Sequence, residues 1–152
     1  MVPTASFRHT AHVEAPPSHV WAAFDLPETW NSIPGVERVH RPVVDESGRL
    51  RGFLFDTVIG GTTYEGEALP AHRDEGRALS WDIANNQIKG RIGVKLDAAG
   101  TGTDLTVSLE ITSVSFVAGM FFGAISSAVA DGFPQMVEDL ARKLGPGNED
   151  PT

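Results

Sequence analysis

The last apolar stretch of the chain, from about Ser115 to Leu144, constrains the fold most strongly, because its pattern predicts one long helix. Apolar side chains recur there every three or four positions, which places them on one stripe of a 3.6-residue helix. About thirty residues at 1.5 Å each make a rod of roughly 45 Å, which needs a large partner surface to cover the stripe. The stripe comprises Phe122, Ile125, Val129, Phe133, Met136, Leu140 and Leu144.

The segments before this helix are typical of strands. Apolar and polar side chains alternate from Phe7 to Val13, and strand-like runs bounded by turn residues follow further along the chain. Such alternation predicts an antiparallel sheet with one face in the core and the other in water. The later runs are Val36–Val44, Leu50–Ile59, Thr62–His72, Ala78–Ala84, Ile88–Leu96 and Leu105–Thr112.

Prolines place two short helices between the first and second strands. One helix is expected to open at Pro16, and a second to run from about Pro27 to Ser32 before Pro34 turns the chain. The predicted fold class is therefore α+β, with a seven-stranded antiparallel sheet curled around the long C-terminal helix. We expect a single domain over residues 1–147 and a disordered tail at 148–152.

Charge and composition exclude several classes of protein. The net charge is −8 and the 12 basic residues are scattered, so the electrostatic signature of a nucleic-acid binder is missing. The chain has no cysteine, which excludes disulfides and thiol chemistry, and no signal-peptide pattern, so a cytoplasmic protein is expected. Residues 114–130 form a run without any charged residue, and this run is just long enough to span a membrane. Serines in this segment, and the apolar stripe that continues beyond it, favour a buried helix.

Three parts of the sequence resemble a known superfamily. They are VEAPPSHVWAAFDLPETWNSIPGVERV from Val13 to Val39, GTGTDLTVSLEI from Gly100 to Ile111, and the long terminal helix. The chain resembles the START/Bet v 1-like (SRPBCC) superfamily and, within it, the polyketide cyclase/dehydrase group. This resemblance implies a helix-grip fold that encloses an apolar cavity, used by different members for lipid or hormone binding, polyketide cyclisation or accessory roles.

A second branch is also similar around Ile33 to Val36 and in the apolar start of the last helix. This branch consists of accessory proteins of carbon monoxide dehydrogenase, which are thought to act at the membrane beside a molybdenum enzyme. Two functions therefore stay open at this point. One is a ligand-binding protein with cyclase or dehydratase activity, and the other is a non-catalytic carrier or accessory protein that resembles the carbon monoxide dehydrogenase branch.

The expected ligand is a small hydrophobic molecule, polyketide-like or lipid-like, held in the internal cavity. Aromatic and aliphatic side chains form the walls of such pockets, and a few polar groups orient the ligand. The candidate ligand-binding residues are His9, Trp30, Phe53, Phe55, Tyr64, Trp81, Phe122, Ile125, Val129 and Phe133.

Two of these residues are candidates for proton transfer, although each also fits a purely structural role. His9 shares a strand face with Phe7 and Val13, so it should point inward, where an imidazole can act as a general acid or base. Tyr64, the only tyrosine, can offer a phenol hydrogen bond in an apolar wall. No residue pair demands catalysis, so no catalytic residue is assigned.

No metal or cofactor is predicted. The five histidines show no close ligand spacing on one face, and no phosphate-binding or nucleophile motif is present. Glu65 and Glu67 share one strand face and could form a carboxylate pair. Tyr64, Gly66 and Ala68 make the better inner face, however, so we expect the two glutamates to lie in water.

The start of the long helix carries apolar residues that its main stripe does not include. At 100° per residue they lie on the back of the helix, and soluble monomers seldom leave such a patch uncovered. We expect a homodimer contact here, because a charge of −8 disfavours an anionic membrane. This back patch comprises Phe116, Val117, Met120 and Phe121.

Overall fold

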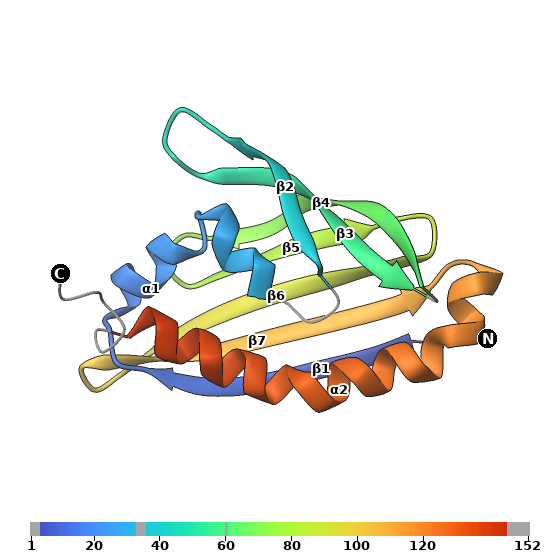
Figure 1. Cartoon of the computed structure of the whole chain (residues 1–152). Helices are drawn as coiled ribbons and strands as arrows, with labels where there is room; N and C mark the ends of the chain where they lie inside the picture. The colour runs from blue at the N-terminus through green and yellow to red at the C-terminus, as the bar shows by residue number, and fades with distance from the viewer. Residues whose placement is uncertain (1–3, 33–35, 60, 146–152) are drawn as a thin grey trace, which may run out of the picture.

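The structure, a computed structural model, describes residues 4–32, 36–59 and 61–145. It confirms the seven-stranded antiparallel sheet, with strand order β1-β7-β6-β5-β4-β3-β2 (Figure 1). The expected tail at 148–152 and the turn at Pro34 lie outside the described residues. The strands are β1 Thr4–Val13, β2 Arg38–Val44, β3 Leu50–Ile59, β4 Thr62–Asp74, β5 Ala78–Ala84, β6 Ile88–Ala99 and β7 Gly102–Ser113.

The helices also lie where the sequence predicts them. Helix α1 spans Pro17–Ala23, a 3-10 helix (η1) spans Pro27–Ser32, and α2 spans Phe116–Leu144. Ser115 caps α2, because its hydroxyl accepts a 3.0 Å hydrogen bond from the Ala118 amide.

Figure 1 shows α2 lying along one side of the curved sheet, with the two short helices near its C-terminal end. Most of its contacts with the sheet are to β1, followed by β7. The inner faces of the strands and the apolar stripe of α2 meet in one continuous core, as the helix-grip arrangement requires. The side chains buried most completely include Trp30, Phe24, Phe133, Leu50, Leu105, Val107 and Val137.

The two halves of α2 are covered very differently. After residue 130 the helix is anchored firmly, and its buried residues there are Phe133, Met136, Val137, Leu140 and Ala141. Before residue 130 only three residues of α2 are buried, namely Ala118, Phe122 and Val129. An 18-residue window of α2 is long and apolar enough to cross a membrane, and 22% of that window is buried. Because the same helix is docked on β1 and β7, we describe it as part of the globular fold.

Candidate functional site

The predicted aromatic wall is present, but its members pack against one another. The ring centroids of Phe53 and Trp81 lie 5.5 Å apart, and those of Trp30 and Trp81 lie 5.9 Å apart. Phe55 stacks edge-on against Phe53 at 6.5 Å. All four side chains are buried, so aromatic rings fill this end of the interior.

One polar atom in this cluster is not satisfied. The Trp30 indole N–H donates a 3.0 Å hydrogen bond to the carbonyl of Phe24. The Trp81 indole N–H, by contrast, is buried and finds no hydrogen-bond partner among the described residues. A buried donor without a partner costs about 1–3 kcal/mol. An acceptor brought in by a ligand would remove that cost.

Side chains beneath the first half of α2 are less completely covered than those of the aromatic cluster. Ile125 and Tyr64 are only partly buried there, and they pack on a small cluster made by Ile59, Ile88 and Ala118. The predicted helix residues Phe122, Val129 and Phe133 are buried in the main core. Two inner-face residues of the sheet, Phe7 and Ile83, are partly buried as well. This region is the part of the predicted site that solvent reaches.

The two candidates for proton transfer do not meet. His9 does face α2, where its Nε2 lies 2.7 Å from a carboxylate oxygen of Glu138, and the two side chains are 29% and 50% exposed. Tyr64 lies on β4, and strands β7, β6 and β5 separate it from β1. At about 4.8 Å per strand, the two backbones are on the order of 19 Å apart along the sheet. The two side chains therefore stand on strands that are far apart in the sheet order.

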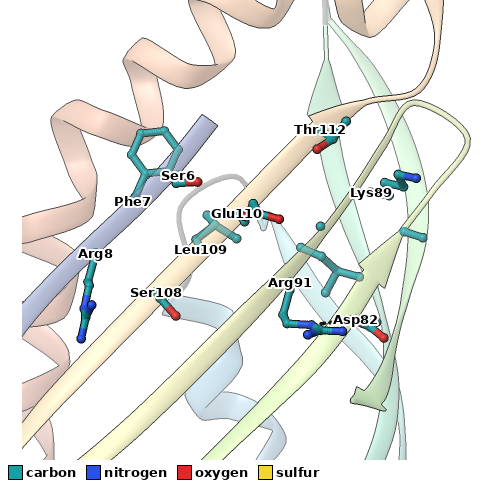
Figure 2. A pocket seen from close by; sticks show the side chains of 13 residues that line it. Ser6, Phe7, Arg8, Asp82, Lys89, Arg91, Ser108, Leu109, Glu110 and Thr112 are labelled. Carbon is teal, nitrogen blue, oxygen red and sulfur yellow. Dashed lines mark hydrogen bonds and ion pairs between the residues drawn. The ribbon is translucent and has the colours of Figure 1, made fainter. Parts of the chain in front are cut away.

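Sequence reasoning missed an open groove on the other face of the sheet. The groove has a volume of about 830 Å³ and crosses β1, β7, β6 and β5 (Figure 2). Arg91 donates a 2.9 Å hydrogen bond to Asp82 there, and this carboxylate raises the pKa of Arg91. Its other outward-facing residues are polar or small, namely Ser6, Arg8, Ala84, Lys89, Ser108, Glu110 and Thr112. Phe7, Ile83, Gly90 and Leu109 also line the groove, so charged and apolar groups are mixed there.

Three residues that could bind a metal ion also lie on this outward face, over β2, β3 and β4. They are His40, Asp56 and Glu65. Glu65 and Glu67 are both exposed, which confirms that they face water.

Comparisons with known proteins agree with this architecture. A family model described as "Polyketide cyclase / dehydrase and lipid transport" matches residues 4–145. The Zhui aromatase/cyclase from Streptomyces sp. R1128 has a similar structure, with a TM-score of 0.68 and 14% identity over 95% of this chain and 98% of that one. A START superfamily protein from Mycobacterium smegmatis gives a TM-score of 0.65 and 15% identity, over 90% and 94% of the two chains.

Norcoclaurine synthase from Thalictrum flavum is similar too, with a TM-score of 0.60 and 15% identity over 94% of this chain and 87% of that one. A search of curated proteins found no match. Identities this low establish a shared fold and no shared activity. The family model covers nearly the whole domain, however, so the chain belongs to the polyketide cyclase/dehydrase and lipid-transport family of the START/Bet v 1-like superfamily.

Proposed function

We propose that this protein binds a small hydrophobic molecule, polyketide-like or lipid-like, between the first half of α2 and the inner face of the sheet. The observation that carries the proposal is the incomplete cover in this region. Tyr64 and Ile125 face the interior from β4 and α2, yet both remain partly exposed, as do Phe7 and Ile83, which also border the outer groove. An apolar ligand placed there would bury this surface at roughly 25 cal/mol per Å².

The aromatic cluster supplies one wall of the proposed site and a polar anchor. Trp81 and Ile83 are two residues apart on β5 and therefore share its inner face. A ligand that lies over Ile83 and carries a carbonyl or hydroxyl oxygen could accept a hydrogen bond from the unpartnered Trp81 N–H. Polyketides and fatty acids both carry such oxygens.

Cyclase-like catalysis is a second candidate, favoured by the pairing of His9 with Glu138. A carboxylate beside an imidazole orients the ring, which suits a group that transfers protons. Catalysis would then consist mainly of confining a flexible chain in one shape, with His9 moving a proton. Binding without chemistry, as in a carrier or accessory protein, requires only the apolar region.

A titration with a fluorescent fatty acid tests the binding proposal. Ile125→Trp adds a large side chain to the partly open region, so we expect it to weaken probe binding about tenfold or more. Ala128→Trp is the matched control, because Ala128 is exposed on the same helix and should leave affinity unchanged. Equal affinities of a folded Ile125→Trp variant and the wild type would show that the ligand lies elsewhere.

We also propose that the back patch of α2 pairs with a second copy of the chain. Phe116 is 83% exposed and Met120 is 65% exposed, and Val117 and Phe121 beside them are also exposed. Apolar groups this exposed in one cluster favour association. The net charge of −8 favours another protein surface over an anionic membrane.

A further inference from the structure

Two carboxylates face each other on the outward side of the sheet. Asp56 on β3 is paired directly with Glu65 on β4 in antiparallel register. Their neighbours Phe55 and Gly66 occupy the inner face, so the two acidic side chains share the outer one. Like charges directly opposite each other destabilise a sheet. A cation between the two carboxylates would turn this repulsion into attraction.

His40 brings a nitrogen ligand to the same point from the edge strand β2. Its Nε2 lies 3.0 Å from Oδ1 of Asp56 and 3.6 Å from Oε2 of Glu65. A tetrahedral zinc ion with bonds of about 2.0–2.1 Å holds its ligand atoms roughly 3.3–3.4 Å apart. The two measured separations lie on either side of that value. All three ligand atoms lie within 4.8 Å of one another, so small side-chain rotations would suffice to close the site.

The surroundings of the cluster hold these ligands in place. The side chains of His40 and Asp56 are only 18% and 20% exposed. Arg38 Nε lies 3.5 Å from Oδ2 of Asp56, which leaves Oδ1 directed toward His40. Outer contacts of this kind orient metal ligands in known sites. Directly after His40, β2 contains an irregularity in register, and Arg41 takes a positive φ of 49°. Such bulges redirect side chains at functional positions.

We propose that His40, Asp56 and Glu65 bind a zinc ion, with the fourth coordination position open to water. One imidazole and two carboxylates form a ligand set that zinc accepts. The site lies on the opposite face of the sheet from the proposed hydrophobic ligand and shares no residue with it. The two proposals can therefore fail independently.

Metal titration tests this site directly. Metal-free protein is titrated with Zn²⁺ by calorimetry and with Co²⁺ by visible absorption, which reports tetrahedral coordination. We expect one equivalent to bind, and we expect His40→Gln and Glu65→Gln each to weaken binding about tenfold or more. Glu65 is 59% exposed, so its substitution should leave the fold intact, as circular dichroism will check.

His12 provides a matched control. It also lies beside two carboxylates, but Asp104 contacts its Nδ1 at 3.1 Å whereas Glu14 contacts its Nε2 at 3.5 Å. Because these carboxylates flank different ring nitrogens, they cannot converge on one ion. His12→Gln should therefore leave zinc affinity unchanged. The absence of saturable binding at millimolar Zn²⁺, or equal losses in His12→Gln and His40→Gln, would overturn the proposal. His40 would then serve only as a hydrogen-bonding partner between the two carboxylates.

Discussion

At the scale of single residues, an ion-pair network near α1 should determine how the domain responds to acid. Arg73 donates hydrogen bonds to Asp25 at 3.1 Å and to Glu75 at 2.8 Å, and its guanidinium lies 5.2 Å from the centre of the Trp21 ring. The Trp21 indole N–H also donates to Glu75, at 3.0 Å. This network ties α1 and the segment after it to the β4–β5 turn.

The hydrogen bond from Arg73, and then the one from Trp21, lower the pKa of Glu75 from 4.5 to about 2. As the pH falls, Glu75 of the unfolded chain takes up a proton near pH 4.5, whereas Glu75 of the folded protein does so only near pH 2. The stabilisation is therefore complete above pH 4.5 and is lost as the pH falls through about 2. We predict that the thermal midpoint falls across this interval, and that it falls less in Glu75→Gln.

Glu46→Gln, a change at an exposed glutamate in the β2–β3 turn, serves as the control and should reproduce the wild-type profile. Added salt should reduce the difference between wild type and Glu75→Gln, because exposed ion pairs are screened. Identical pH profiles for wild type and Glu75→Gln would contradict this account.

At the scale of elements, α2 contains a proline that its stability does not require. Pro134 lies at an exposed position inside the helix and has no amide hydrogen to donate to the carbonyl of Ala130. Proline in a helix interior costs about 3 kcal/mol relative to alanine. We therefore predict that Pro134→Ala raises the free energy of unfolding by roughly 1–3 kcal/mol, as measured by urea titration.

Gln135→Ala, at the neighbouring exposed position, should change the free energy of unfolding by less than about 0.5 kcal/mol. A Pro134→Ala variant that is no more stable than the wild type would mean that the proline gives α2 a shape that its packing on β1 needs.

Alternation and turn residues were enough to predict most strands, because each side chain reports which face it occupies. Leu50–Ile59 and Ala78–Ala84 match the observed strands at both ends. The hairpin of β6 and β7 continues further than predicted, with Ala99 paired to Gly102. Backbone pairing does not require alternating side chains, and Gly100 adopts the positive φ of 64° that a tight turn favours.

The C-terminal end of α2 at Leu144 is where the apolar stripe predicts it. Gly145, which follows, is extended, with φ −82°, and its amide donates to the carbonyl of Arg142.

The group formed by His40, Asp56 and Glu65 shows why the sequence alone did not predict a metal site. Asp56 is paired with Glu65 in a register that sets Ile59 opposite Thr62, and the two consecutive glycines between these positions in the sequence could have predicted that register. His40 joins them only through the irregular register of β2 against β3. Comparing histidines with one another could not reveal a site whose other ligands are carboxylates on neighbouring strands. The partial exposure of some inner-face residues could not be predicted either, because a sequence pattern indicates which face of a strand is buried but not how completely.

At the scale of the whole molecule, the exposed start of α2 predicts self-association. The double change Phe116→Asp and Met120→Lys replaces the two most exposed apolar side chains of the back patch with charges. We predict that the mass measured by light scattering falls to that of a monomer, while circular dichroism stays unchanged. A wild-type protein that is already monomeric at micromolar concentration, without added lipid, would contradict the dimer.

The position of a bound hydrophobic molecule is the central claim, and nuclear magnetic resonance with a spin-labelled fatty acid tests it most directly. The label broadens the signals of nearby nuclei, so it locates the ligand without any substitution. We predict strong broadening at Tyr64, Phe122 and Ile125, which contact the interior from β4 and α2, and much weaker broadening at Lys95 on the outer face. Broadening confined to the back patch of α2 or to the outer groove, with the interior signals unaffected, would contradict the account.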